Sequence, residues 1–329
     1  MSAAGALAGC APAARSHEAP AFPIRRGVNL GNALDAPNEG DWGYRIEAAH
    51  LRAIGAAGFD GVRLPVHWDT HMDERGRVSA AHMARVAEVI GWAMEARLKV
   101  QLDVHHYEAL IADPSAHTPH FLALWRQIAE RFAEAPASLL FEPLNEPNGR
   151  AWDGARLTDL QCAVIAAIRE SNATRTIVLG PGNWQSIDAL ERWRPPTAEN
   201  IAVSVHYYEP HDFTHQGAEW LGAEAPRFGR AWGNEADVGL VQAHIERAAA
   251  WGAQRGHAVQ LGEFGVNRAL TPPQRALWTR TVRQACETHG LSWCVWDFAG
   301  AFPVWDRERG AFIPEMTEAL FADDRIGER

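Results

Sequence analysis

The sequence lacks any apolar stretch that approaches the roughly 20 residues a membrane-spanning helix requires. It also lacks a cluster of Lys and Arg, and its net charge of −10 is spread along the chain. These absences predict that the protein does not span a membrane, and they make nucleic acids and anionic membrane surfaces poor partners. A neutral ligand is compatible with this charge balance.

Cysteine is also scarce. The four cysteines, Cys10, Cys162, Cys286 and Cys294, show no metal-binding spacing, and they permit one disulfide without requiring it. Cys10 ends the segment LAGC, which resembles a bacterial lipoprotein cleavage site, although a basic start and a full apolar run are missing. We expect residues 1–23 to form a disordered tail, either the remnant of a signal or lipoprotein segment or an Ala-rich extension.

Tyrosine is rare as well, with 4 residues against 14 Trp. The structural interpretation is that a large α/β core uses many Trp side chains. The functional interpretation is that some of them line an open groove, where a flat apolar ring stacks on a flat apolar face of a ligand. Composition alone leaves both interpretations open.

Short apolar segments alternate with helical patterns along the chain. The segments are rich in β-branched or aromatic residues and end in polar or Gly residues, as buried parallel strands do. They are 26–32, 59–66, 99–106, 139–146, 176–182, 201–208, 258–265 and 292–298. Apolar residues that recur every three or four positions predict helices, among them 82–98, 121–135, 157–170 and 240–256. Gly58 and Gly256 stand where helices are expected to end.

Strands and helices that alternate in one uninterrupted series predict a (β/α)8 TIM barrel of class α/β, formed by residues 24–329 as a single domain. The chain is longer than the roughly 250 residues typical of that fold, and the long segment 209–233 accounts for the surplus. An open, doubly wound sheet is the alternative. Its dinucleotide loop GxGxxG is absent, because the segment at 27–32 reads GVNLGN.

Polar residues gather at the ends of the predicted strands, which is where active sites of this fold lie. Two of them are carboxylates, Glu146 after the fourth strand and Glu263 after the seventh. Two carboxylates that flank one bond are the minimal machinery for glycoside cleavage, one as a protonated acid and the other as an ionised nucleophile. A lone glutamate would more often serve a salt bridge, but Asn145 beside one of them and Arg63 on the second strand argue against that role. Another acid, Glu142, lies inside the apolar fourth strand.

A series of motifs follows the predicted strands in order: RGVNLGNALDAPNEGDWG, GFDGVRLPVHW, LDVHHYEAL, FEPLNEP, VHYYEPHDFTHQGAEW, LGEFG and WCVWDF. Together they resemble the successive signatures of glycoside hydrolase family 5, and in particular its compact bacterial endoglucanases, some of which also cleave mannans. The likeness runs from about residue 24 to residue 320. It implies a retaining double displacement with Glu146 as acid/base and Glu263 as nucleophile.

The resemblance also implies supporting roles around the two carboxylates. Arg63 is the expected cation near the nucleophile and Tyr208 its hydrogen-bond donor, and both favour the ionised carboxylate. Asn145 is expected to hold the sugar 2-hydroxyl, a contact that strengthens in the transition state. His206 is expected to bond near the acid/base and to help its proton cycle.

On the glycone side, which holds the sugar that becomes attached to the enzyme, we expect His106 to reach sugar hydroxyls and Asn29 to contact the same sugar. The resemblance also places His105 on this side. A role as a partner of Asp103 or Arg63 is equally open for it.

Trp296, after the eighth strand, is implied to form the platform under the sugar at the cleavage point, with a core position as the alternative. Asp35 and Trp42 in the first loop are expected to shape more distant glycone subsites. The expected contacts on the leaving-group side, or alternatively packing within the long loop, are His215, Gln216 and Trp220.

The sequence thus predicts a monomeric, cofactor-free endo-β-1,4-glucanase that acts on a β-linked polysaccharide or oligosaccharide. A mannanase, glucomannanase, bifunctional glucanase-mannanase or xyloglucanase is the alternative within this class, since glucose and mannose differ only at the 2-hydroxyl. From another class, a catalytically weak carbohydrate-binding barrel would tolerate loss of a carboxylate. A metal-dependent barrel hydrolase would need His-x-His on one strand, whereas the adjacent His105 and His106 have a poor chelating spacing. Secretion, a periplasmic location or a lipid anchor through Cys10 is expected, because polymeric glucans do not enter cells.

Overall fold

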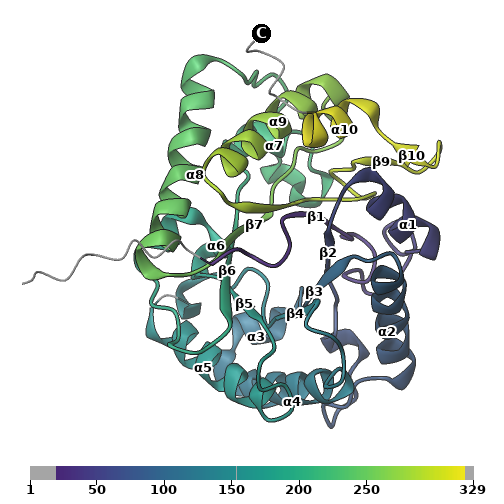
Figure 1. Ribbon diagram of the computed structural model, residues 1–329, viewed down its shortest axis with the longest axis vertical. Helices are drawn as coiled ribbons and strands as arrows, with labels where there is room; N and C mark the ends of the chain where they lie inside the picture. Colours follow the sequence, from purple (N-terminus) through teal and green to yellow (C-terminus); the bar gives the residue numbers. More distant parts are fainter. Residues whose placement is uncertain (1–19, 153, 323–329) are drawn as a thin grey trace, which may run out of the picture.

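The computed structural model describes residues 20–152 and 154–322 of the chain. Eight parallel strands form a closed barrel in which each strand pairs with the next and β1 pairs with β8 (Figure 1). The strands are β1 (Arg26–Asn29), β2 (Gly61–Leu64), β3 (Lys99–Asp103), β4 (Leu139–Glu142), β5 (Ile177–Leu179), β6 (Ile201–His206), β7 (Val259–Glu263) and β8 (Ser292–Val295). The predicted (β/α)8 barrel is confirmed, and each predicted strand is present in shortened form.

Helices surround the ring of strands (Figure 1). The α-helices are α1 (Ala48–Ala57), α2 (Ala80–Glu95), α3 (Glu108–Ala112), α4 (Pro114–Arg131), α5 (Ala155–Arg169), α6 (Gly182–Gln185), α7 (His211–Thr214), α8 (Glu235–Arg255), α9 (Pro272–Thr288) and α10 (Pro314–Phe321). Short 3-10 turns are η1 (Asp69–His71), η2 (Arg150–Trp152), η3 (Ile187–Ala189) and η4 (Glu219–Glu224), and a small antiparallel pair joins β9 (Trp305–Asp306) to β10 (Ala311–Phe312).

The residues at the two ends of helix α8 show why the helix begins and ends where it does. At its start, the Asn234 side chain accepts a hydrogen bond from the backbone N–H of Asp237, which satisfies a donor that the first helical turn leaves free. At its end, Gly256 adopts a left-handed conformation with φ of 70°, and Gly58 closes α1 in the same way with φ of 105°. Both predicted helix ends are therefore confirmed.

The connection between β5 and β6 departs from the regular pattern. A four-residue helix, α6, and the turn η3 replace the long helix found in most of the other connections. Asn183, Trp184 and Gln185 are consecutive residues in the left-handed region, with φ of 54°, 56° and 52°. This turn directs the Gln185 side chain into the barrel, where it is fully buried.

A cluster of apolar side chains fills the interior of the barrel near the amino-terminal ends of the strands. It consists of Phe22, Ile24, Leu140, Val178, Ala202 and Ala258. Phe22 is only 6% exposed, so the predicted tail boundary at residue 23 is wrong for this residue, which packs as part of the core. Toward the carboxyl-terminal ends of the strands the interior is polar, and Arg63, Gln101 and Glu142 are fully buried there.

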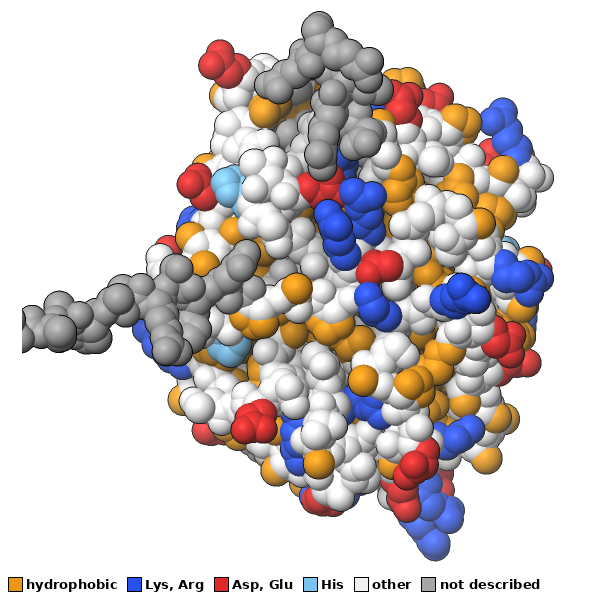
Figure 2. All heavy atoms as spheres, in the orientation of Figure 1, with side chains coloured by type: hydrophobic (Ala, Val, Ile, Leu, Met, Phe, Trp, Pro, Cys, Tyr) orange, Lys and Arg blue, Asp and Glu red, His pale blue; other side chains and the backbone are white. Residues whose placement is uncertain are grey.

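Acidic and basic side chains are interspersed over the face of the molecule seen in Figure 2. Among the described residues, no helix is long and apolar enough to cross a membrane. Cys162, Cys286 and Cys294 are free thiols, whereas Cys10 and the proposed lipoprotein site lie outside the described residues.

Candidate active site

The chemically important side chains lie at the carboxyl-terminal ends of the strands and in the loops that directly follow them. Strand β4 ends at Glu142 and not at Glu146 as predicted, so Asn145 and Glu146 belong to the following loop. Glu146 adopts a positive φ of 45°. Its backbone N–H donates to Gln185 Oε1 at 2.7 Å, so the unusual turn after β5 supports the loop that carries Glu146.

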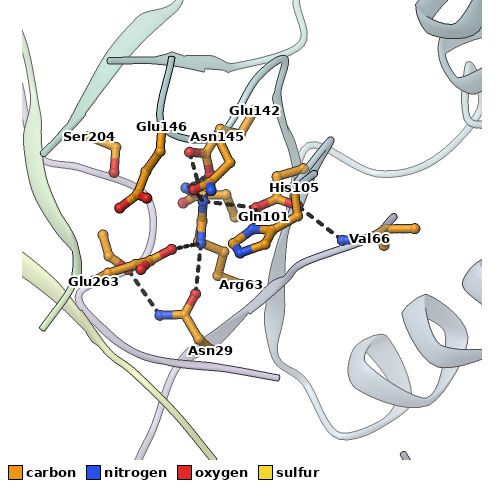
Figure 3. Close-up of polar contacts among 12 residues, drawn as sticks. Asn29, Arg63, Val66, Gln101, His105, Glu142, Asn145, Glu146, Ser204 and Glu263 are labelled. Atoms are coloured by element: carbon orange, nitrogen blue, oxygen red, sulfur yellow. Dashed lines mark hydrogen bonds and ion pairs between the residues drawn. The ribbon is translucent and has the colours of Figure 1, made fainter. Parts of the chain in front are cut away.

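Arg63 lies at the centre of the polar contacts near the carboxyl-terminal end of the barrel, which we call the mouth (Figure 3). Its Nε and Nη2 donate to both oxygens of Glu142 at 2.6 and 3.0 Å, and Nη2 also pairs with Asp103 at 2.8 Å. Gln101 Nε2 donates to Glu142 at 2.7 Å. Burial would raise the pKa of Glu142, but the Arg63 charge and the hydrogen bonds from Arg63 and Gln101 together outweigh it, and the net pKa is lowered. Glu142 is therefore a buried anion that fixes the guanidinium.

The other edge of the guanidinium faces the mouth. Nη1 donates to Glu263 Oε1 at 2.6 Å and to Asn29 Oδ1 at 3.1 Å, while Nη2 donates to Asn145 Oδ1 at 2.7 Å. The predicted pairing of Arg63 with Glu263 is confirmed. Asn29 was expected to contact sugar, but it is fully buried and its amide donates to backbone carbonyls of β7 and β8, including Gly262 O at 2.9 Å. Asn29 therefore positions Arg63 and does not reach a ligand.

The carboxylates of Glu146 and Glu263 extend into the same space on one side of Arg63 (Figure 3). One oxygen of each, together with a nitrogen of His206, all lie within 4.8 Å of one another. His206 Nδ1 is 2.7 Å from Glu146 Oε1 and 3.6 Å from Glu263 Oε2, and the Tyr208 hydroxyl donates to Glu263 Oε2 at 2.8 Å. A short separation of this kind fits retaining glycosidases, whose carboxyl groups lie roughly 5–5.5 Å apart, better than the roughly 6.5–9.5 Å of inverting enzymes.

The surroundings of the two carboxyl groups differ in how they affect ionisation. Burial raises the pKa of Glu146 to about 7, although 26% of its side chain remains exposed. Burial also raises the pKa of Glu263; a protonated His206, the Arg63 charge and the hydrogen bond from Tyr208 reduce this rise, but the net pKa stays above its ordinary value. His206 itself has its pKa lowered by burial to about 4, so it is neutral near pH 6. Near neutral pH, Glu146 can thus hold a proton, while the contacts with Arg63 and Tyr208 favour the ionised form of Glu263.

A second group of predicted residues meets at the other side of the mouth. Asp35, His105 and His106 each place a potential ligand atom within 4.8 Å of the others. The His105 ring stacks on Trp296, with ring centroids 5.3 Å apart and planes 6° apart, and its Nδ1 is 3.0 Å from Asp103. Trp42 is 45% exposed and its ring approaches His106 edge-on. The interpretation of His105 as a partner of Asp103 is thereby confirmed, and the ring also supports Trp296.

The long segment after β6 forms a third part of the rim. Trp220 is 56% exposed and lies with His215 against Phe302, at ring-centroid distances of 5.7 and 5.3 Å from that ring. Gln216 is only 2% exposed, and its amide is held by Phe213 O, Arg230 O and Gly229 N. The prediction that Gln216 contacts a ligand is therefore wrong, because this side chain ties the loop together from inside.

Two residues of this site were not predicted. Glu142 is visible in the sequence as a lone acid within an apolar strand, and that signal marks a buried partner for a cation. Gln185 gives no comparable signal, because it reaches the site through three consecutive left-handed residues.

The family model described as cellulase (glycosyl hydrolase family 5) matches residues 23–301. The chain belongs to glycosyl hydrolase family 5. The predicted site residues, from Asn29 to Trp296, fall inside the matched region of this family 5 chain.

Known proteins similar to this family 5 chain include endoglucanase H of Acetivibrio thermocellus, which is 30% identical over 90% of the chain and 32% of its own length. Endoglucanase 3 of Fibrobacter succinogenes is 26% identical over 90% of the chain and 52% of its own length. The chain thus spans about a third to a half of these relatives. The solved structure of endoglucanase Cel5A from Thermotoga maritima superposes with a TM-score of 0.86 at 38% identity, covering 90% of this chain and 97% of that one.

Proposed function

We propose that this family 5 chain is a retaining endo-β-1,4-glucanase, with Glu263 as nucleophile and Glu146 as acid/base. The observation that carries the proposal is the short separation of these two carboxylates. Burial raises the pKa of Glu146, which favours its protonated form, whereas Glu263 accepts hydrogen bonds from Arg63 and Tyr208. The endoglucanase names of the relatives support glucan as the substrate.

The proposed reaction has two displacements. Glu263 attacks the anomeric carbon while Glu146 transfers its proton to the glycosidic oxygen, so the C–O bond breaks and a glycosyl ester forms on Glu263. Glu146, now ionised, takes a proton from water, and the resulting hydroxide equivalent attacks the same carbon and releases Glu263. Two inversions return the original anomeric configuration.

The neighbours of the two carboxylates have separate tasks in this scheme. Asn145 Oδ1 accepts from Arg63, which leaves its NH2 group as a donor for the sugar 2-hydroxyl. Neutral His206 bonds to Glu146 and can steady its carboxyl group in both protonation states. We assign Trp296 as the sugar platform on the glycone side and the exposed Trp220 as the platform on the leaving-group side.

Glucomannan is a second candidate substrate. The observation that favours it is a solved structure of Thermotoga maritima Cel5A in complex with a mannotriose substrate, which is 37% identical and has a TM-score of 0.86. Comparing initial rates of reducing-end release from carboxymethyl cellulose, barley β-glucan, glucomannan and galactomannan orders the substrates. We expect the glucans to be cleaved fastest, and exclusive cleavage of galactomannan would contradict the primary proposal.

The test of the catalytic assignment is Glu263→Ala. We expect turnover to fall by several orders of magnitude while the melting temperature stays close to that of the parent, and azide to restore cleavage of an activated aryl glycoside with inverted configuration. Glu308→Ala, at an exposed carboxylate on the β9–β10 turn, is the control and keeps full activity. Normal turnover of the Glu263→Ala protein on soluble glucan, or activity abolished by a chelator, would overturn the mechanism.

We also propose that the protein acts as a monomer outside the cytoplasm. The support is the expected substrate, because a glucan polymer does not cross membranes. Fractionation of producing cells tests the location, and gel filtration coupled to light scattering tests the monomer.

A further inference from the structure

Asp35, His105 and His106 form a compact set of donor atoms beside the proposed catalytic pair. Asp35 comes from the loop after β1, and the two histidines directly follow β3. One ligand atom of each lies within 4.8 Å of the other two. The sequence argued against chelation, since adjacent histidines on a regular strand point to opposite faces. Strand β3 ends at Asp103, however, so both histidines lie on irregular backbone and can converge.

The surroundings hold two of these donors in place. His105 Nδ1 bonds to Asp103 Oδ2 at 3.0 Å, and the flat stacking on Trp296 fixes the ring plane. A carboxylate on one imidazole nitrogen leaves the lone pair on the other, which is the outer-shell arrangement seen behind metal-ligating histidines. The two oxygens of Asp35 accept backbone N–H groups of Asn32 at 2.9 Å and Ala33 at 2.7 Å, and each keeps a lone pair.

The third donor, His106, is the one through which an ion can reach the cluster from solvent. The His106 side chain is 33% exposed, and its Nδ1 is 3.7 Å from Glu108 Oε1, too far for a good hydrogen bond. His106 can therefore shift toward an ion. The His67 ring lies beside it, with ring centroids 5.4 Å apart.

We propose that Asp35, His105 and His106 bind a divalent first-row transition-metal ion of the Zn2+ class. Two imidazoles and one carboxylate form a common ligand set for such ions, and Zn–N and Zn–O bonds of about 2.0–2.2 Å are reached from this spacing by a small movement of His106. Water completes the coordination from the open side.

The catalytic group itself is the competing location, since Glu146, His206 and Glu263 also place ligand atoms within 4.8 Å of one another. Its donors are already engaged: His206 Nδ1 bonds to Glu146, and both oxygens of Glu263 accept, one from Arg63 and one from Tyr208. An ion there must displace these bonds and lie near the Arg63 cation. The Asp35 cluster has two imidazoles, one of them on the partly exposed and loosely held His106, so it is the favoured site.

An ion bound to the ring nitrogens of His105 and His106, near Trp296, would occupy the space of a glycone sugar. The expected consequence is that Zn2+ competes with glucan, and this consequence rests on the proposed function. Binding of the ion does not, because it can be measured without any substrate.

The test is calorimetric titration of ZnCl2 into the chelator-treated full chain, with Asp35→Asn, His106→Gln and Glu146→Gln as variants. We expect one ion per chain for the parent and for Glu146→Gln, and an affinity weakened by at least about tenfold in Asp35→Asn and His106→Gln. His289→Gln, at a histidine between the end of α9 and the start of β8 and so at the opposite end of the barrel, is the matched control and binds like the parent. Thermal melts establish that every variant is folded.

Three outcomes would overturn the site. They are the absence of stoichiometric binding by the parent, unchanged affinity in both Asp35→Asn and His106→Gln, and loss of binding in Glu146→Gln with retention in the other two. In a parallel assay, Zn2+ is expected to raise KM for soluble glucan without changing kcat. If the titration succeeds and no glucan is cleaved under any condition, the metal site stands and the proposed function fails.

Discussion

The hydrogen bond from Tyr208 to Glu263 gives a quantitative test of how the site ionises its proposed nucleophile. The Tyr208 hydroxyl lies 2.8 Å from Glu263 Oε2, and Tyr208→Phe removes this donor while keeping the ring that packs near His215 and Phe302. Arg63 remains on the other oxygen at 2.6 Å, so the carboxylate stays in place.

A hydrogen bond to a charged group contributes about 1.5–3 kcal/mol. One pKa unit corresponds to about 1.4 kcal/mol, so the lost bond is worth roughly 1–2 units. The bond stabilises the ionised carboxylate, and its removal therefore raises the pKa of Glu263. Since the nucleophile must be ionised, the acid limb of kcat/KM is expected to move to higher pH by this amount.

The assay is the pH dependence of kcat/KM for a soluble cello-oligosaccharide substrate, for the parent and for Tyr208→Phe. Tyr207→Phe is the matched control, because this neighbouring tyrosine is also buried but its hydroxyl contacts His244 on α8, away from the carboxylates. We expect the acid limb of the control to coincide with that of the parent. An acid limb that is the same in all three proteins would refute the role of Tyr208 in setting the ionisation of Glu263.

Two further predictions use the same electrostatics. Because burial raises the pKa of Glu146 to about 7 and the acid must be protonated, kcat/KM is expected to fall as the pH rises through about 7, and an alkaline limb that persists unchanged in Glu146→Gln would contradict the assignment. Glu142→Gln leaves part of the Arg63 charge without its buried partner and is expected to lower the free energy of unfolding by about 3–5 kcal/mol in urea melts. The control Glu318→Gln, on an exposed pair with Arg280, is expected to change it by less than about 1 kcal/mol, and equal effects would argue against Glu142 as an anchor.

The fold was predictable because its signal is periodic and repeated. Each strand is an apolar run bounded by helix-ending glycines or polar residues, and eight such runs leave few alternatives. The boundaries were less predictable. Segments such as 139–146 read as one strand, yet pairing stops at Glu142, because hydrogen bonding between strands and not apolar character defines where a strand ends.

The site was predictable where a residue's role depends on its place at a strand end, as for Arg63, Glu263 and His206. It was not predictable where the role depends on side-chain direction. Asn29 and Gln216 are polar residues near the mouth, but each turns its amide toward backbone carbonyls and is buried. A sequence shows that such a residue is near the site, whereas only three-dimensional packing shows which neighbours satisfy its hydrogen bonds.

The arrangement around Arg63 also explains why the two carboxylates can differ. Residues on the rigid strands β2, β3 and β4 fix the guanidinium through Asp103 and Glu142, and its remaining edge meets Glu263 at the end of β7. Glu146 instead lies on a loop with positive φ, tied to Gln185 and His206 and bonded to no cation when His206 is neutral. Glu263 is thus positioned by residues on the barrel strands, whereas Glu146 is positioned mainly by loop residues. A change that loosens the β5–α6 turn should therefore disturb the acid/base step before it disturbs the nucleophile.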